Sequence, residues 1–253
     1  MSGSADPRVR RVADAEALAR AGAEAVAAAA EQAVAARGRF TLALSGGSTP
    51  RPVYALLADP RAPFRARVPW DRTHVFFGDE RPVPPHHPDS NYRMAREALL
   101  AHVPVASVHR IPAEQPGASE AYEGELRSFF ALPPGAEPPR LDLVLLGLGP
   151  DGHTASLFPG TTALDEWTRW VASPWVARLG TARTTLTFPV LNRAREVLFL
   201  VSGADKADAL RRVLAPAPGA DALPAARVAP ADGRVAWIVD AAASTGLDGQ
   251  ERG

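Results

Sequence analysis

The sequence predicts an α/β fold with a doubly wound, mainly parallel sheet and a small antiparallel addition. Apolar runs of strand length alternate with helix-forming segments, which is typical of parallel strands joined by helices. Several of these runs end in polar turns, as strands do at the ligand-binding edge of such a sheet. With 253 residues, 46% of them hydrophobic and 22% charged, the chain has the size and composition of one large globular domain. No fixed-period repeat or linker divides residues 1–253, and only the polar ends, 1–7 and 244–253, are expected to be flexible.

Composition and charge narrow the possible functions. The chain has 28 Lys and Arg residues and 28 Asp and Glu residues, so its formal net charge is zero. A neutral chain has no overall attraction for nucleic acid or an anionic membrane, and a small anionic ligand is the better expectation. The absence of cysteine excludes disulfides and thiolate metal ligands and is compatible with a reducing compartment. Since the sequence has no secretory segment at its N-terminus and no apolar run near the ~20 residues of a membrane span, we expect a cytoplasmic protein.

The first half of the chain alternates helix and strand patterns. Residues 14–37 are rich in alanine and favour a helix, which Gly38 can end. A helix is also expected over residues 51–57, because Thr49 is a natural N-cap and Pro50 suits the first helical position. The remaining elements expected here are strands at 40–44, 74–77 and 108–112, and helices at 91–100, capped by Asp89 or Ser90, and at 119–131.

The second half is organised around a nearly unbroken apolar run at residues 141–148, LDLVLLGL. Such a run suits a strand that is buried on both faces of a parallel sheet. Further elements are expected as strands at 183–188, 196–201 and 235–239 and as a helix at 204–214. The segment 169–195 is expected to add the antiparallel strands. Three tryptophans in or near it are interpreted as packing residues rather than a sugar-stacking site: Trp167, Trp170 and Trp175.

The turn after the strand at 40–44 has the character of a phosphate cradle. Its sequence, SGGSTP, places Gly46 and Gly47 where backbone N–H groups can face one point, and the following helix adds its positive end. The turn matches neither the GxGxxG nor the P-loop pattern, so nucleotide binding is not implied. A tight strand-to-helix turn without a ligand is the alternative. No GxSxG elbow supports Ser45 or Ser48 as a nucleophile.

Three charged residues directly follow the strand at 74–77: Asp79, Glu80 and Arg81. A surface loop is the simpler explanation for them, and a place at the ligand-binding edge of the sheet is the other. Farther along the same loop, His86 and His87 lie near Asp89. Because adjacent histidines point apart and no third ligand has a recognisable spacing, we expect no metal site.

Two later turns carry the residues with the most distinctive chemistry. Asp151 and His153 follow the central apolar run, and imidazole is the side chain that titrates near pH ~6.5. A buried histidine that donates to a carbonyl is the alternative for His153. Lys206 stands in the first turn of the next helix, where its charge opposes the helix dipole. Either a bound phosphate or a nearby carboxylate, Asp205 or Asp208, is expected to offset that charge.

These polar turns are expected to meet. In open α/β sheets the ligand crevice lies outside the carboxyl ends of the strands, so turns distant in sequence can line one pocket. The residues expected there are Ser45, Gly46, Gly47, Arg81, Asp151, His153 and Lys206. Anion-binding groups together with one imidazole favour a phosphorylated small molecule as the ligand, and hydrolysis or proton transfer as the chemistry.

Five stretches carry a resemblance to a known family: LALSGGSTP (42–50), FGDERPVPP with PDSNY (77–92), GLGPDGHTASLFPG (147–160), RTTLTFPVLN (183–192) and LFLVSGADKADAL (198–210). In these stretches the chain is similar to the 6-phosphogluconolactonases of the glucosamine-6-phosphate isomerase/6-phosphogluconolactonase family. Long motifs in the same order are far more specific than one short pattern. The likeness covers residues 40–214 and continues more weakly to residue 240.

The resemblance implies a Rossmann-like, glucosamine-6-phosphate deaminase-like fold without a cofactor or a required metal. It implies hydrolysis of 6-phospho-D-glucono-1,5-lactone to 6-phosphogluconate in the oxidative pentose phosphate pathway, with His153 as the general base that activates water and Asp151 beside it. The implied substrate-contacting residues are Ser45, Gly46, Gly47, Arg81, Arg183 and Lys206. Of these, Arg183 and Lys206 are expected to hold the phosphate, whereas Arg81 could contact the phosphate or the ring oxygens.

Two other functions stay open from sequence. The related deaminases resemble DGHIAFNEP, with a Glu five positions beyond the His where this chain has Phe158, so amino-sugar deaminase or isomerase activity is the second expectation. A sugar-phosphate-sensing module of a transcriptional regulator is the third, although residues 1–39 offer one helix rather than a helix-turn-helix pair. The expected partner is a phosphosugar lactone, without nucleic acid or membrane, and the oligomeric state is open, with a monomer favoured.

Overall fold

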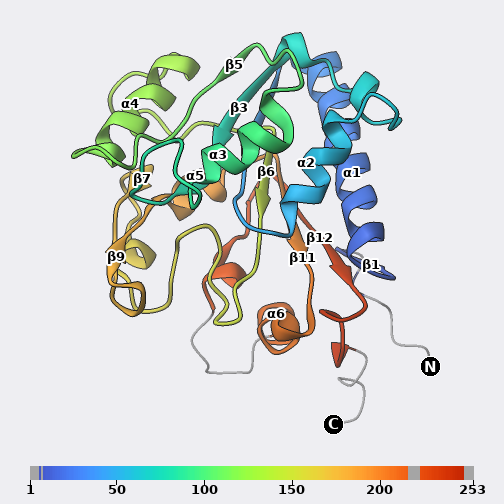
Figure 1. Ribbon diagram of the computed structural model, residues 1–253. Helices are drawn as coiled ribbons and strands as arrows, with labels where there is room; N and C mark the ends of the chain where they lie inside the picture. Colours follow the sequence, from blue (N-terminus) through green and yellow to red (C-terminus); the bar gives the residue numbers. More distant parts are fainter. Residues whose placement is uncertain (1–5, 7, 216–222, 248–253) are drawn as a thin grey trace.

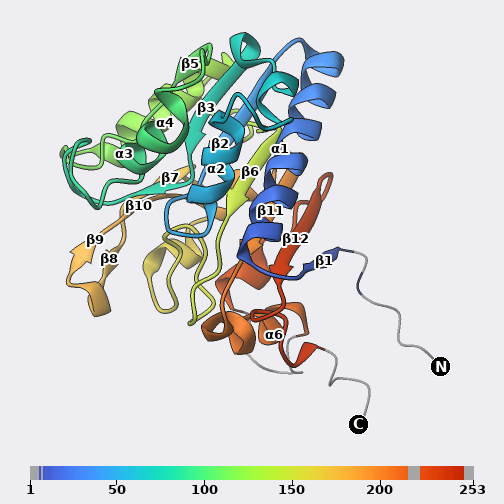
Figure 2. The ribbon, with the colours of Figure 1, turned by 45° about the vertical axis from the view of Figure 1, so that its right-hand side comes forward.

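A seven-stranded parallel sheet forms the centre of the computed structural model, which describes residues 6, 8–215 and 223–247. The strand order is β1-β12-β11-β6-β2-β3-β5, and every neighbouring pair is parallel. The strands are β1 (Val9–Val12), β2 (Phe40–Leu44), β3 (Thr73–Phe77), β5 (Ser107–Val108), β6 (Leu143–Leu146), β11 (Glu196–Val201) and β12 (Arg234–Asp240). The chain builds from β2 to β3 and β5, and then from β6 in the other direction to β11 and β12. The order therefore reverses between β2 and β6, which confirms the predicted doubly wound sheet (Figures 1 and 2).

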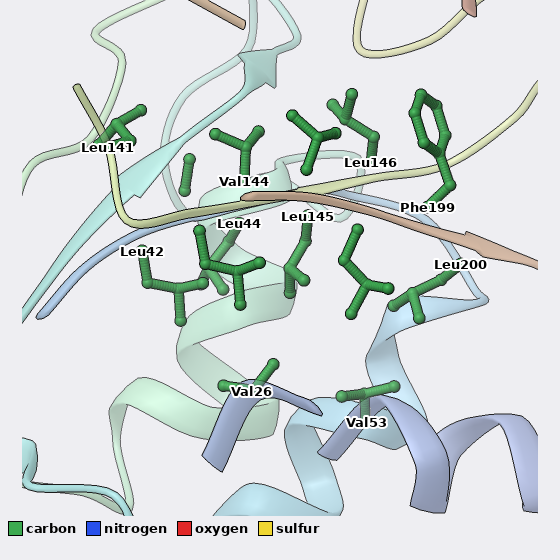
Figure 3. Close-up of a cluster of buried hydrophobic side chains, with 14 of the residues drawn as sticks. Val26, Leu42, Leu44, Val53, Leu141, Val144, Leu145, Leu146, Phe199 and Leu200 are labelled. Atoms are coloured by element: carbon green, nitrogen blue, oxygen red, sulfur yellow. The ribbon is translucent and has the colours of Figure 1, made fainter. Parts of the chain in front are cut away.

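Helices lie on both sides of this sheet (Figures 1 and 2). They are α1 (Ala15–Arg37), α2 (Pro50–Ala58), α3 (Asn91–Ala95), which continues as the π-helix η3 (Arg96–Leu100), α4 (Ala118–Phe130), α5 (Phe188–Leu191) and α6 (Ala207–Leu214). Val26 of α1 and Val53 of α2 lie on the side to which Leu145 of β6 points, whereas Val144 and Leu146 point to the opposite side (Figure 3). All three β6 side chains are fully buried. This burial on both faces explains why β6 is an unbroken apolar run.

Most predicted elements are confirmed, although some of their ends differ. The helix expected over 14–37 is α1, in which the Asp14 carboxylate accepts a hydrogen bond from the backbone nitrogen of Ala17 at 2.8 Å. The strands expected at 40–44 and 196–201 are β2 and β11. Thr49 occupies the N-cap position of α2, but its side chain makes no capping hydrogen bond. The sequence does not predict β1, and the strand expected at 108–112 is only the two-residue β5.

Two small antiparallel sheets stand beside the main sheet and confirm the predicted antiparallel addition. One joins β4 (Asp79–Glu80), β10 (Thr184–Leu186) and β7 (Val171–Ala172), and the other is the hairpin of β8 (Trp175–Val176) and β9 (Thr181–Ala182). The first sheet fixes the turn after β3 against a segment much later in the chain. Trp170 is buried here, as expected, whereas Trp167 and Trp175 are 57% and 64% exposed and lie at the surface.

The structure describes the first four residues of the C-terminal segment 244–253, for which flexibility stays a prediction. Residues 244–247 form a turn, in which the backbone nitrogen of Ser244 donates to the carbonyl of Asp240 at 3.0 Å. The rest of that segment, and residues 1–7 apart from Asp6, lie outside the described residues. Among the residues that are described, none of the helices has the length and apolar character needed to cross a membrane.

Candidate active site

A cavity of about 370 Å³ opens at the carboxyl edge of the sheet, where the strand order reverses between β2 and β6. The turns that follow β2, β4, β6 and β11 all contribute to its lining, so the four polar turns meet in one place. Seven of the eight site residues expected from sequence line it: Ser45, Gly46, Gly47, Arg81, His153, Arg183 and Lys206. The eighth, Asp151, does not line the cavity but is hydrogen-bonded to His153.

The turn after β2 approaches the start of α3 too closely for any residue but glycine at position 46. A Cβ on Gly46 would lie 1.8 Å from Oδ1 of Asn91. Asn91 is held in place by a hydrogen bond from its Nδ2 to the carbonyl of Asp79 at 2.9 Å. Oδ1 of Asn91 and Oγ of Ser45 are buried without a hydrogen-bond partner. Buried polar atoms are normally paired, so two unpaired oxygens close together are unusual. Both residues line the cavity.

Two buried carboxylates hold the turns of the cavity together. Glu80 accepts four hydrogen bonds of 2.7–3.0 Å, from the backbone nitrogens of Arg81, Asn91 and Tyr92 and from Oγ of Ser90. Burial raises the pKa of Glu80, and these donors oppose the rise. Asp79 accepts from Oγ of Ser156 at 2.6 Å, which ties the turn after β3 to the turn after β6. Asp79 and Glu80 are only 8% and 3% exposed, so the surface-loop explanation of these charges is wrong.

Asp151 and His153 are closely paired in the turn after β6. Oδ1 of Asp151 lies 2.5 Å from Nδ1 of His153 and 3.2 Å from its backbone nitrogen. The pair folds back over Gly149, where a Cβ would lie 2.0 Å from Nδ1 of the imidazole, so only glycine permits this approach. The imidazole is thus paired with a carboxylate and not with a backbone carbonyl.

Arg178, which sequence reasoning does not single out, contacts this pair from the hairpin of β8 and β9. It belongs to η5 (Ala177–Leu179), the short turn between the two strands. Its Nη2 lies 2.9 Å from Oδ2 of Asp151, and its guanidinium stands 4.7 Å from the centroid of the Phe158 ring. The Phe158 ring in turn stacks on His153, with ring centroids 4.1 Å apart and 30° between the planes. Asp151 is therefore held from both sides, and His153 is covered on one face.

Burial and charge set the protonation of the pair. Burial raises the pKa of Asp151, but the hydrogen bonds and charge of His153 and the charge of Arg178 outweigh it, so the pKa falls below its ordinary value. Burial lowers the pKa of His153 below 6.5, Asp151 opposes this change, and the charge of Arg178 adds to it. At neutral pH the pair is therefore a carboxylate and a neutral imidazole. The imidazole donates from Nδ1 and keeps Nε2 as a proton acceptor.

Besides Arg178, three cationic side chains line the same cavity: Arg81, Arg183 and Lys206. Burial, and next the nearby charge of Arg81, lower the pKa of Arg183, so the two guanidinium groups are close enough to repel each other. An anion bound between them would remove that repulsion. Lys206 stands at the N-cap position of α6, with Nζ 2.7 Å from Oδ2 of Asp205. Of the two expected ways to offset the charge of Lys206, the structure contains the carboxylate.

Several contacts of the site escape sequence reasoning. Asn91 and Ser156 lie within the stretches that carry the family resemblance, so the sequence could have singled out these two residues. It gives no indication of which groups they contact. Arg178 lies in none of those stretches. Over the described parts of the chain, no group of three His, Asp or Glu side chains is arranged to hold a metal ion.

Comparison with known proteins places the chain in a family. The profile of the family described as glucosamine-6-phosphate isomerases/6-phosphogluconolactonase matches residues 13–237. The chain belongs to this family. One relative within it, a protein named 6-phosphogluconolactonase from Nostoc sp., is 46% identical over 215 residues, which cover 83% of this chain and 85% of that protein.

Solved structures agree with this assignment. The 6-phosphogluconolactonase from Trypanosoma brucei is 31% identical, with a TM-score of 0.82 over 95% of this chain and 98% of that chain. A monomeric glucosamine-6-phosphate deaminase is 20% identical, with a TM-score of 0.72 over 94% of this chain and 98% of that chain. At this low identity, the second comparison shows a shared fold alone.

Proposed function

We propose that this protein hydrolyses 6-phospho-D-glucono-1,5-lactone to 6-phospho-D-gluconate, a reaction of the oxidative pentose phosphate pathway. The observation that carries the proposal is that His153, oriented by Asp151, lines the same cavity as the cationic side chains of Arg81, Arg183 and Lys206. A phosphorylated lactone needs both parts, because water must attack its ester while its charged end is held in place. The similarity to relatives named 6-phosphogluconolactonase supports the choice of substrate.

In this proposal His153 is the general base. Nδ1 of His153 is hydrogen-bonded to Asp151, so Nε2 is the nitrogen that accepts a proton. Nε2 takes this proton from water as the water oxygen attacks the carbonyl carbon of the lactone. Collapse of the tetrahedral intermediate breaks the bond between that carbon and the ring oxygen. The imidazolium then returns its proton to the departing ring oxygen, so one group serves as base and acid in turn. Such catalysis typically gives about 10²–10⁴-fold in rate.

The oxyanion of the intermediate needs a hydrogen-bond donor. The backbone N–H groups of Gly46 and Gly47 and the guanidinium of Arg81 are the candidates, because all three residues line the cavity. One such donor is worth about 10²–10³-fold in rate. The glycine turn has the added advantage that it precedes the N-terminus of α2, where the helix dipole favours negative charge.

The other contacts of the substrate follow from charge and hydrogen-bonding capacity. Arg183 and Lys206 hold the phosphate, and Arg81 contacts either the phosphate or the ring oxygens. The unpartnered Oδ1 of Asn91 can only accept a hydrogen bond, so it suits a sugar hydroxyl and not a phosphate oxygen. Oγ of Ser45 can donate or accept and suits either group.

Deaminase or isomerase activity on an amino sugar is less well supported. Phe158 occupies the position at which the related deaminases resemble a motif with Glu, and its ring stacks on His153 without offering a carboxylate. A sensing module would need the cavity but not the oriented imidazole. The cytoplasmic location, the monomeric state and the lack of nucleic-acid or membrane partners stay predictions.

One experiment separates these functions. Purified protein is given the phospholactone and, separately, glucosamine 6-phosphate. We expect acid release from the first, well above spontaneous hydrolysis, and no ammonia from the second. Ammonia release would instead indicate a deaminase, and binding without turnover would indicate a sensor. Unphosphorylated gluconolactone is the control and should be a poor substrate, because it makes none of the phosphate contacts.

A further inference from the structure

A second cavity lies at the amino edge of the central sheet, at the other end of the strands from the candidate active site. Its volume is about 290 Å³. Arg39, Asp142 and Arg195, which line it, are the residues immediately before β2, β6 and β11. Because these three strands are parallel neighbours, their first residues lie side by side. A strand of five residues spans about 17 Å, so the two cavities are separate sites.

This amino-edge cavity is strongly cationic. Its charged lining residues are Arg37, Arg39, Arg140, Arg193 and Arg195, against Glu137 and Asp142. Five positive and two negative charges give a formal charge of +3, although the whole chain has a net charge of zero. Burial and the charges of Arg37 and Arg140 lower the pKa of Arg195, as expected for crowded like charges. An anion bound among these groups would relieve their repulsion.

The carboxylates of the cavity leave its guanidinium groups incompletely paired. Asp142 is 7% exposed, and its Oδ2 accepts from the backbone nitrogen and Oγ1 of Thr41, both at 2.8 Å. Its Oδ1 lies 2.7 Å from Nη2 of Arg37. Arg195 reaches the same Oδ1 only at 3.4 Å, and its buried Nε has no hydrogen-bond partner. Since a guanidinium has several N–H donors, donors remain for a ligand.

The rest of the lining combines further cations with apolar surface. The guanidinium of Arg39 stands 5.1 Å and 5.5 Å from the ring centroids of Phe129 and Phe130. Arg193 donates to the carbonyl of Pro138 at 2.9 Å. The apolar residues of the lining are Phe130, Leu132, Pro138 and Pro139. The cavity thus offers guanidinium groups for an anion beside an apolar wall for a ring.

We propose that the amino-edge cavity binds a small anion that carries two or more phosphoryl groups and a flat ring, of which a nucleoside diphosphate is the simplest. One phosphate carries about −1.5 to −2 charges at pH 7, so two phosphoryl groups match a charge of +3 better than one. Guanidinium groups bind phosphate oxygens with two hydrogen bonds each, and the ring packs on the apolar wall. This site is independent of the proposed lactonase function.

Isothermal titration calorimetry with ADP, pyrophosphate and inorganic phosphate tests the proposal. The titrations are made with saturating 6-phosphogluconate present, which occupies the candidate active site. We expect ADP and pyrophosphate to bind, ADP the more tightly, and phosphate to bind weakly. The affinity should fall steeply as salt is raised from about 50 mM to about 300 mM, because surface charges are then screened.

Variants locate the binding site. Arg193→Gln with Arg195→Gln should weaken ADP binding by about tenfold or more, and Arg39→Gln alone should weaken it measurably. The exposed Arg72→Gln, outside both cavities, and Lys206→Gln, in the candidate active site, should leave ADP binding within about twofold. Thermal unfolding checks that each variant is folded. If the double variant is not folded, Arg39→Gln alone tests whether the cavity binds ADP. The proposal is overturned if wild-type protein does not bind ADP, if the arginine variants bind it as tightly as wild type, or if Lys206→Gln abolishes binding.

Discussion

Oδ1 of Asp151 lies 2.5 Å from Nδ1 of His153, although only one residue separates the two in the chain. The contact is made within one turn, and the two side chains fold back over Gly149, where they leave no space for a Cβ. It is also reinforced from a distance, since Arg178 holds the second carboxylate oxygen at 2.9 Å. The turn after β6 therefore presents an imidazole with a fixed tautomer and a free Nε2.

Arg178→Gln is expected to move the acid limb of the kcat–pH profile to higher pH. The charge of Arg178 lowers the pKa of His153, so its removal lets that pKa rise. Because His153 must be neutral to accept a proton, the variant should lose activity at a higher pH than wild type as the solution is acidified. The measured quantity is kcat, since the phosphate of the free substrate itself titrates near pH ~6 and affects KM.

Arg169→Gln is the matched control for this experiment. Arg169 is also a partly exposed arginine, but its closest carboxylates are Glu120 and Glu166, each at 3.8 Å. Its replacement should leave the pH profile unchanged. If Arg178→Gln left the acid limb in place or moved it to lower pH, Arg178 would have no part in setting the protonation of His153.

Arg183→Gln and Lys206→Gln are each expected to raise KM by about tenfold, because each removes one charge-assisted contact to the phosphate. The value of kcat should change much less, since the phosphate is held equally in the ground state and the transition state. Steady-state kinetics on the phospholactone provide both numbers. Arg212→Gln, an exposed arginine on the same helix as Lys206, is the control. An unchanged KM in both variants would remove these residues from the phosphate site.

Ser156→Ala is expected to lower the free energy of unfolding by about 1.5–3 kcal/mol, the usual contribution of a buried hydrogen bond to a charged group. The variant leaves Oδ2 of Asp79 without the donor that lies 2.6 Å away in the wild type. Urea denaturation followed by circular dichroism measures the change. Ser128→Ala, at an exposed position of α4, should stay within about 0.5 kcal/mol of wild type. Equal stability of the two variants would mean that the Asp79–Ser156 contact does not hold the turns together.

Gly46→Ala is expected to destabilise the protein by about 1–3 kcal/mol and to reduce activity, because the new Cβ would overlap Oδ1 of Asn91. Adding Asn91→Ala should restore part of the lost stability, since the overlapping atom is then absent. Gly124→Ala, in the interior of α4 with open space around it, should instead stabilise by about 0.5–1 kcal/mol. Urea denaturation of all three variants checks the order. A Gly46→Ala protein as stable as wild type would contradict the close approach.

Strands buried on both faces are the elements that the sequence predicts best. β2 and β11 are apolar throughout or nearly so, and both their ends are predicted correctly. β1 is missed because two of its four residues are exposed arginines, so its pattern resembles that of a charged loop. Such an edge strand has no helical or alternating pattern of apolar residues, so the sequence does not predict it. It forms because its backbone pairs with β12.

The candidate site also has one part that the sequence predicts and another that it does not. Its polar turns are predictable as a group, because parallel strands present their carboxyl ends at one edge of the sheet. The contact of Arg178 is not predictable, because it depends on a hairpin of two-residue strands that leave no periodic pattern. The burial of Asp79 and Glu80 is hidden for a similar reason. Their hydrogen-bond donors come largely from Ser90, Asn91 and Ser156, and the sequence does not show that these residues fold against them.

The most direct test of the account is the kinetics of His153→Gln on the phospholactone, with the binding of 6-phosphogluconate measured on the same preparation. If His153 is the general base, kcat should fall by about 10²-fold or more while the affinity for the product stays within about twofold. Thermal unfolding confirms that the variant is folded. A kcat near that of wild type would contradict the account.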